Sequence, residues 1–327
     1  MNLTELNQSS HCVNFSCPER SVFPAVYILL YVCSAAVVLL TVCGNLLVII
    51  AVCYFRKLHT PTNMLVLSLA VSDFLVGLFV MPFHFTWLIE SCWMFGQIFC
   101  LLFNFMTFQL TSVSVGNIVL IALDRYVALS NPFLYLTDVT STVVHTLIWL
   151  LWVSSFLYNF VFFYMNGNFT DLLLCPGECL VNALSEVGSL IDLVFILIVP
   201  CGLMLILYLQ IFVIARRHAN AIRELNHNLT VSKNVTDAMK SERKAAKVLG
   251  ILVSVFLACL VPYYICTLMS TTASSSVIVN NILILFYLNS SINPVIYALF
   301  YSWFQKCTKM ILTCKILHTD CSFVNVL

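Results

Sequence analysis

Residues 25–54 read AVYILLYVCSAAVVLLTVCGNLLVIIAVCY, a stretch that contains no charged side chain. An apolar segment of about 20 residues is long enough to cross the hydrocarbon core of a bilayer as a helix. Within lipid, every backbone N–H and C=O group must pair inside the protein, so a spanning segment is either a helix or a strand of a closed barrel. Because the stretch lacks the alternating pattern of a barrel strand, it predicts a transmembrane helix.

Six further apolar runs follow, joined by short polar or proline-marked connections. They cover residues 62–89, 100–129, 142–165, 185–215, 245–270 and 277–300. Hydrophobic residues make up 61% of the 327-residue chain and charged residues only 9%, so a water-soluble domain of this length could not bury its apolar surface. The sequence therefore predicts an all-α membrane protein, a seven-transmembrane helix bundle. The formal net charge of +1 provides no basic field for nucleic acid.

Lysine and arginine side chains gather on one side of the predicted membrane, which the positive-inside rule assigns to the cytosol. Residues 1–24 are then an extracellular tail, residues 25–300 the seven-transmembrane domain, and residues 301–327 a cytoplasmic segment. We expect no cleaved signal peptide, because residues 1–23 lack a basic start and an apolar stretch. Glycosylation sequons on the outer side are Asn2, Asn7, Asn14 and Asn168.

Two cytoplasmic segments differ in character. After residue 300, Trp303, Phe304, Met310 and Ile311 recur at helical spacing among lysines. This pattern predicts a short amphipathic helix on the inner leaflet, in contact with lipid; a frayed tail is the alternative. Residues 231–242 are polar and charged, and we interpret them as a linker.

The second run contains a buried carboxylate, Asp73, and neighbouring runs offer polar partners for it. An unpaired carboxylate in this position would be costly, so a satisfied polar network is expected. Its oxygens predict a cation site, with Na⁺ as the candidate cofactor; a purely structural network is the alternative. The candidate ligands are Asp73, Ser114, Asn289 and Asn293.

The inner end of the third run reads LDRYVAL and contains Asp124, Arg125 and Tyr126. An arginine at a helix end needs an acidic partner, which could be Asp124 or Glu242. A pair that breaks and reforms can act as a two-state switch. The alternative is a charged cluster that only extends its side chains to the membrane surface.

A second intramembrane carboxylate, Asp192, lies in the fifth run, eight residues before Pro200. A charged side chain near the middle of a spanning helix costs about 2.5–3.5 kcal/mol on insertion scales. We interpret Asp192 as the counter-ion of a protonated amine, which carries its charge at neutral pH as lysine does. The alternative is a carboxyl group that is protonated or bonded to a neighbouring hydroxyl and serves folding alone.

Several short motifs, each in a different run, together carry a family resemblance. They are GNLLVI, LAVSD, DRY, Trp152, Pro200, Pro262 and NPVIY. On these motifs the chain resembles the rhodopsin-like G-protein-coupled receptors from end to end. The segments NSSINPVIYALFYSWFQK, SERKAAKVLGI, CWMFG and CPGEC further resemble the trace amine-associated receptors, which are olfactory amine receptors of vertebrates.

The resemblance implies a plasma-membrane receptor for small amines that signals through a stimulatory or olfactory heterotrimeric G protein and raises cyclic AMP. It implies disulfides from Cys100 to Cys179 and from Cys17 to Cys175. Relatives carry an aspartate on helix three where this chain has Thr107, and a tryptophan on helix six where it has Leu260. A fish-rich branch of the family places the aspartate on helix five, as Asp192 does here.

The remaining candidate residues follow from this comparison. We expect the ligand to contact Asp192, Thr107, Phe108, Thr111, Ser189, Tyr263, Tyr264 and Tyr287. For the aromatic residues, and for Phe108 above all, ordinary core packing is the alternative. We expect the switch toward the G protein to involve Asp124, Arg125, Tyr126, Glu242, Tyr208, Asn293, Pro294 and Tyr297.

Rival classes fit the sequence less well. A transporter would show internal repeats, and an enzyme would show a catalytic motif such as H-E-x-x-H or G-x-S-x-G; we find neither, and expect no enzyme. Within receptors, the runner-up is a non-olfactory biogenic amine receptor with a serotonin-like ligand.

Overall fold

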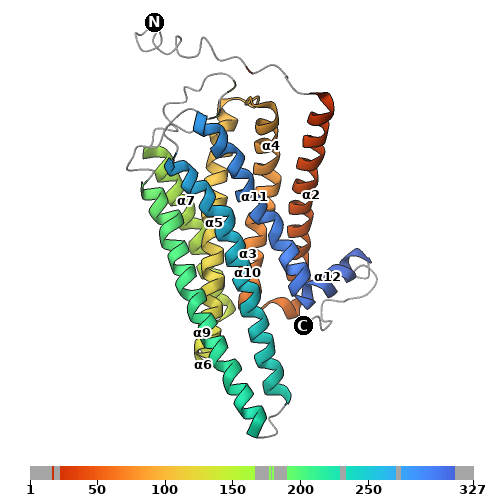
Figure 1. Ribbon diagram of the computed structural model, residues 1–327, viewed down its shortest axis with the longest axis vertical. Helices are drawn as coiled ribbons and strands as arrows, with labels where there is room; N and C mark the ends of the chain where they lie inside the picture. Colours follow the sequence, from red (N-terminus) through yellow and green to blue (C-terminus); the bar gives the residue numbers. More distant parts are fainter. Residues whose placement is uncertain are drawn as a thin grey trace.

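The protein is a bundle of helices along its whole described length. The computed structural model describes Cys17, Gly177, Cys179 and residues 23–165, 190–228, 233–269 and 274–313, without the side chains of 136, 218–247 and 267–281. Figure 1 shows the long helices running side by side along the longest axis of the molecule. Over the described residues, the β-type pairing consists of one isolated bridge, between Trp93 and Gly177.

Seven helices of the described chain are long and apolar enough to cross a membrane. Five of them are single helices: α2 (Pro24–Tyr54), α5 (Gln97–Ser130), α7 (Ser141–Met165), α10 (Lys233–Met269) and α11 (Ser274–Phe300). The second membrane helix consists of α3 (Pro61–Leu75), η2 (Val76–Val80) and α4 (Met81–Glu90) in succession, and the fifth consists of η3 (Leu193–Ile198) and α9 (Val199–Asn228). Three short helices are η1 (Arg56–Leu58), α6 (Pro132–Asp138) and α12 (Ser302–Leu312). The prediction of an all-α, seven-transmembrane bundle is confirmed.

Helix α10 begins earlier than the sequence indicated. Residues 231–242 were interpreted as a linker, which is wrong from Lys233 onward, because α10 begins there. Polar composition suggested a loop, but the segment KSERKAAK (residues 240–247) consists mainly of Lys, Glu, Arg and Ala, which have high helix propensity. The sixth membrane helix therefore continues well beyond its apolar part.

Two wide, π-helical segments interrupt the spanning helices just before a proline. The segment η2 is followed by Met81 and then Pro82, and the segment η3 is followed by Val199 and then Pro200. A proline inside a helix lacks the N–H group for the carbonyl four residues earlier and its ring crowds that carbonyl. A local widening relieves the conflict, and such π-bulges are frequent at functional sites. Asp192 directly precedes η3.

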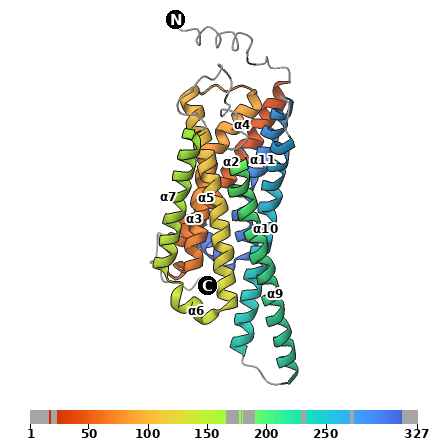
Figure 2. The same ribbon diagram turned by 90° about the vertical axis from the view of Figure 1, so that its left-hand side faces the viewer.

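The bundle directs apolar side chains both inward and outward. Large side chains such as Leu29, Trp149 and Leu209 are 61%, 62% and 62% exposed, as expected for a surface that faces lipid tails. Helix α5 lies in the middle of the bundle and contacts α3, α7, α9 and α10 (Figure 2). Its side chains therefore line both the outer and the inner half of the interior.

Helices α2 and α11 approach closely at Gly44. A Cβ atom added to this glycine would lie 2.8 Å from Cβ of Pro294, so a larger residue would force the helices apart. The close contact places Asn45 next to α11, where its Nδ2 donates to the carbonyl of Ser290 at 3.0 Å.

The short helix α12 follows the last spanning helix and confirms the predicted amphipathic segment. Trp303, Phe304 and Cys307 are buried and belong to the main hydrophobic core, while Gln305 and Lys306 are exposed. The apolar face is packed against α2 and α11, rather than being left entirely to the membrane surface.

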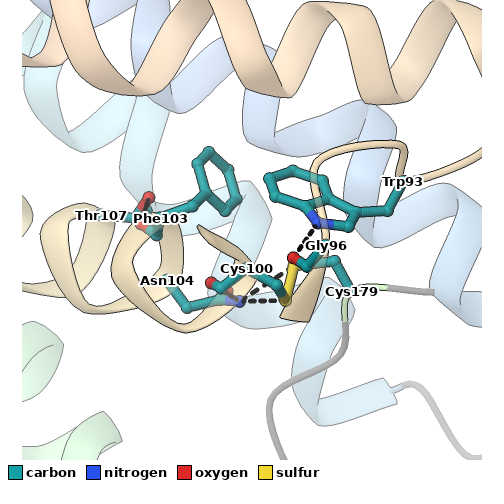
Figure 3. Close-up of a disulfide and its surroundings, with 7 residues drawn as sticks. All are labelled: Trp93, Gly96, Cys100, Phe103, Asn104, Thr107 and Cys179. Atoms are coloured by element: carbon teal, nitrogen blue, oxygen red, sulfur yellow. Dashed lines mark hydrogen bonds between the residues drawn. A yellow bond between two sulfur atoms is a disulfide. The ribbon is translucent and has the colours of Figure 1, made fainter. Parts of the chain in front are cut away.

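One disulfide fastens the outer end of α5. Cys100 and Cys179 are bonded, with their Cα atoms 5.5 Å apart, as the resemblance implied (Figure 3). Asn104, one turn further along α5, donates from Nδ2 to the carbonyl of Cys100 at 2.9 Å. Trp93 covers this region and donates from Nε1 to the carbonyl of Gly96 at 2.9 Å.

The second predicted disulfide is wrong. Cys17 is bonded to Cys92, at a Cα–Cα distance of 5.4 Å, and not to Cys175. Cys92 follows the turn that ends α4 at Ser91, whose φ of 52° is left-handed. Cysteine spacing alone does not determine connectivity, and the outer end of α4 is the partner that the folded chain brings within bonding distance of Cys17. Cys175 lies outside the described residues.

Candidate functional site

Asp192 lies inside the membrane-spanning segment Leu190–Arg217 and is only 8% exposed. Its Oδ2 accepts a hydrogen bond of 3.3 Å from the phenol of Tyr264 on α10. Its Oδ1 is buried and has no hydrogen-bond partner among the described residues. The carboxylate is therefore held at one oxygen, while the other can receive a donor.

Tyr158 of α7 lies beside the same carboxylate, a neighbour that the sequence did not single out. The two side chains are close enough to interact, so Tyr158 is a second phenol beside the carboxylate, in addition to Tyr264. Tyr158 stands in an aromatic-rich stretch, LYNFVFF, and nothing in that pattern distinguishes it from an ordinary packing residue.

Aromatic side chains of α10 and α11 form the wall next to Asp192. The rings of Tyr263 and Tyr264 meet edge to face, with centroids 5.3 Å apart, and Tyr263 also contacts Phe286 at 6.3 Å. Phe286 in turn contacts the fully buried Tyr287 at 5.9 Å. Of the predicted ligand contacts, Tyr263, Tyr264 and Asp192 are thus brought together directly.

Thr107 occupies the position at which relatives carry the helix-three aspartate, and its hydroxyl group is already hydrogen-bonded. Thr107 donates to the carbonyl of Phe103 in its own helix at 2.8 Å (Figure 3). It lies close to the phenol of Tyr287, which is buried in α11. The ring of Tyr287 also contacts the buried ring of His84, with centroids 4.9 Å apart, and nothing in the sequence pattern indicated this neighbour.

Three other predicted ligand contacts are placed differently. Phe108 packs against Phe162 and Phe163 of α7, with centroids 5.9 Å and 5.4 Å away. Thr111 is partly buried on α5. Ser189 lies outside the described residues. The aromatic contacts of Phe108 show that it supports the α5–α7 interface.

The carboxylate of Asp73 is the centre of a buried polar network in the lower half of the bundle. Its Oδ1 accepts from Ser290 at 2.8 Å and its Oδ2 accepts from Asn293 at 2.7 Å. Ser114 pairs with Ser72 at 3.1 Å, on the helix that carries Asp73. The Oδ1 atoms of Asn289 and Asn293 are buried without a hydrogen-bond partner in the described part of the chain. Oxygens of this kind are the ligands that hard cations prefer.

At the cytoplasmic end of α5, Arg125 is engaged by its own neighbour. Its guanidinium lies 2.6 Å from Oδ2 of Asp124 and also bonds the hydroxyl of Thr62. Tyr135, on α6, donates to Oδ1 of Asp124 at 2.9 Å and accepts from Arg125 at 3.3 Å. Burial raises the pKa of the Tyr135 phenol, which keeps it a donor. The predicted acid–arginine pair thus includes two further side chains, Thr62 and Tyr135.

The other predicted switch residues occupy the inner half of the bundle. Tyr297 is buried in α11, with ring contacts to Tyr301 and Phe304. The ring of Tyr208 on α9 lies against Gly250 of α10. Pro294 contacts Gly44, and Tyr126 packs at the edge of the core. The side chain of Glu242 lies outside the described part, as do the sequons at Asn2, Asn7, Asn14 and Asn168.

Comparisons with known proteins agree with this architecture. A family model described as the 7 transmembrane receptor (rhodopsin family) matches residues 44–297. Trace amine-associated receptor 13c of Danio rerio is 36% identical, over 98% of this chain and 97% of that protein. Trace amine-associated receptor 7d of Rattus norvegicus is 38% identical over 96% and 90%, and trace amine-associated receptor 1 of Homo sapiens is 34% identical over 95% of each.

Seven membrane helices and the matching family model define a receptor of the seven-transmembrane rhodopsin class. Within that class, the chain belongs to the trace amine-associated receptors. It is a multi-pass plasma-membrane protein with an extracellular N-terminus, and it is a receptor rather than an enzyme, as predicted. Its assignment to a fish-type branch stays a prediction.

Proposed function

We propose that the protein is an olfactory receptor for protonated amines, anchored at Asp192, and that it activates a stimulatory or olfactory heterotrimeric G protein to raise cyclic AMP. The single observation that carries the proposal is the buried carboxylate of Asp192, of which one oxygen has no partner among the described residues. The relatives named trace amine-associated receptors support an amine as the ligand class.

The physical reason is the cost of an unmatched charge in a poorly hydrated site. A buried carboxylate that lacks a cationic partner is unstable relative to one in water. An alkylammonium ion stays charged at neutral pH, and its attraction to a carboxylate is much stronger in the protein interior than in water. Tyr263 and Tyr264 border the carboxylate and add apolar surface for the hydrocarbon part of the ligand. Thr107 cannot replace Asp192, because a hydroxyl group carries no charge.

Signal transmission would follow from a shift between two helix arrangements. Asp192 and Tyr264 join the outer ends of the fifth and sixth membrane helices, so a ligand that binds there acts on both. Pro262 lies inside α10, two residues from Tyr264, and weakens the helix at that point. If the outer ends of the fifth and sixth membrane helices move inward when the ligand binds, their cytoplasmic ends would move apart. Arg125, which Asp124 holds, lies at that cytoplasmic end.

We further propose that Na⁺ binds near Asp73, with Ser114, Asn289 and Asn293 as candidate oxygen ligands. The unpartnered Oδ1 atoms of the two asparagines support this. A bound ion stabilises the state that binds it, so replacing choline by Na⁺ at constant ionic strength should raise the melting temperature of the purified receptor. Asp73→Asn should abolish the rise, and an equal rise in this variant would exclude the site.

The amine site is tested by expressing the receptor with a cyclic-AMP reporter and screening primary, secondary and tertiary amines. Asp192→Asn should lower potency at least a hundredfold at equal surface expression. The control is Glu90→Gln, which removes a carboxylate from the outer end of α4, where it accepts from Tyr31. If Asp192→Asn and Glu90→Gln have the same potency, the amine is anchored at another residue. If amines change another second messenger but not cyclic AMP, the assignment to a stimulatory or olfactory G protein is wrong.

A further inference from the structure

Exposed basic side chains from two segments far apart in the sequence lie at the cytoplasmic end of α2. Arg56 and Lys57 belong to η1, which follows α2, and Lys306 and Lys309 belong to α12. Helix α12 contacts α2, and Figure 1 shows it turning aside from the end of α11 at this end of the bundle. The two segments together form a basic corner, which consists of these four side chains.

The backbone that carries the basic corner is fixed by buried contacts. Leu58 of η1 is fully buried, and its carbonyl accepts from Nδ2 of Asn63 at 2.9 Å. Trp303 and Phe304 of α12 are buried in the same hydrophobic core as Leu58. The basic corner is therefore preformed, and a ligand that binds there does not have to order either segment.

The charge of the basic corner is not balanced within its own segments. The sequence contains no Asp or Glu between residues 43 and 72 or between residues 293 and 319. Clusters of lysine and arginine directly next to the cytoplasmic end of a membrane helix, or on an amphipathic helix, attract anionic lipids of the inner leaflet. The basic corner combines both situations.

An apolar surface that faces lipid lies next to the basic corner. Helices α2 and α11 meet closely at Gly44 and Pro294. From this level toward the cytoplasm, α2 exposes Leu46 and Ile50, by 39% and 36%, and α11 exposes Leu299 by 66%. Both helices end at the basic corner, so acyl chains can pack on these side chains while a head group reaches the lysines and arginine. The binding surface therefore fits an amphiphile rather than a soluble anion.

We propose that the basic corner binds a phospholipid of the cytoplasmic leaflet whose head group carries more than one phosphate group, a polyphosphoinositide. Lysine and arginine bind phosphate oxygens through charge-assisted hydrogen bonds. Several phosphate groups on one head group can pair with η1 and α12 at once, whereas phosphatidylserine, with one net negative charge, can neutralise only one of the four basic side chains. The inference is independent of the amine function, because none of these side chains belongs to the ligand site.

The test measures lipid binding to the purified full-length receptor. Native mass spectrometry follows the binding of phosphatidylinositol bisphosphate and of phosphatidylserine, and melting temperatures are compared in nanodiscs that contain either lipid at equal total negative charge. The dissociation constant for phosphatidylinositol bisphosphate should be at least tenfold lower, and this lipid should raise the melting temperature. The double variant Lys57→Gln and Lys309→Gln, which removes one charge from each segment, should increase that dissociation constant at least tenfold.

The control is the double variant Arg216→Gln and Arg217→Gln, which removes two exposed charges from the cytoplasmic half of α9. It should bind phosphatidylinositol bisphosphate within twofold of the wild type, and melting temperatures in phosphatidylcholine alone show whether each variant folds. Equal weakening in both double variants, or no weakening in the first, would overturn the inference. Equal affinity for phosphatidylserine would exclude recognition of several phosphates. If soluble inositol trisphosphate binds as tightly as the lipid, the apolar surface contributes nothing and the assignment to a membrane lipid is wrong.

Discussion

The phenol of Tyr135 donates a hydrogen bond of 2.9 Å to Oδ1 of Asp124, the residue that holds Arg125. The bond connects the short helix α6 with the end of α5, eleven residues earlier. Thr62 of α3 completes the cluster by donating to Oδ2 of Asp124 at 2.8 Å. The acid–arginine pair is thus tied to two neighbouring segments.

This arrangement predicts the effect of Tyr135→Phe. The variant keeps the ring and removes one hydrogen bond, which is worth about 0.5–1.5 kcal/mol, so the state with a free Arg125 becomes about two- to tenfold more populated. Ligand-independent cyclic AMP should rise at equal surface expression. Phe133→Leu, in which an 84% exposed residue of the same helix is changed, is the control. Unchanged or lower basal signalling in Tyr135→Phe would show that the bond does not restrain the switch.

Replacing Pro200 should change the potency of the ligand, although Pro200 itself is not expected to contact it. Its ring accounts for the π-helical segment η3, and Asp192 lies at the start of that segment. Pro200→Ala allows a regular α-helix, which changes the rotation of Asp192 about the helix axis, since the π-bulge contributes one additional residue to a turn. We expect amine potency to fall at least tenfold. Pro24→Ala, at the start of α2, where proline is readily replaced, should have no effect. Equal potency of the Pro200 variant and the wild type would contradict the role of the bulge.

A carboxylate can be introduced where relatives carry one. Thr107→Asp places it beside Tyr287, on the side of α5 that faces α11. With Asp192 retained, the site then contains two acidic groups, and diamines should gain potency relative to monoamines by at least tenfold in the cyclic-AMP assay. Thr107→Asn serves as the uncharged control of similar size. An identical ligand profile for all three proteins would mean that residue 107 does not reach the ligand.

Cys307 of α12 should resist modification. Its side chain is fully buried, and burial raises the pKa of the thiol to about 12, so almost no thiolate is present at neutral pH. Raising the pH from 7 to 9 accelerates maleimide labelling of an ordinary thiol but should leave Cys307 unlabelled in the folded receptor. Mass spectrometry of the α12 peptide measures this, with denatured receptor as the positive control. Labelling in the native protein at pH 7 would contradict the packing of α12.

The sequence by itself determined the seven helices, their orientation and the existence of two intramembrane carboxylates. These features depend on local properties: an apolar run of sufficient length must form a helix in lipid, and lysine and arginine mark the cytoplasmic side. The amphipathic helix α12 was predictable for the same reason, because its pattern lies within one short segment. The charged beginning of α10 was not, since its polar composition fits a linker as well as a helix.

Only the tertiary structure decided which side chains meet across helices. Tyr158 was indistinguishable from the other aromatics of its segment until the packing of α7 placed it beside Asp192. Cys17 paired with Cys92 and not with Cys175, and Asp124 gained Tyr135 as a partner. Each of these contacts depends on how helices rotate and cross, which is set by close packing of many side chains at once. A single sequence specifies the surfaces that pack, but the distance between two residues on different helices emerges only when the whole bundle is assembled.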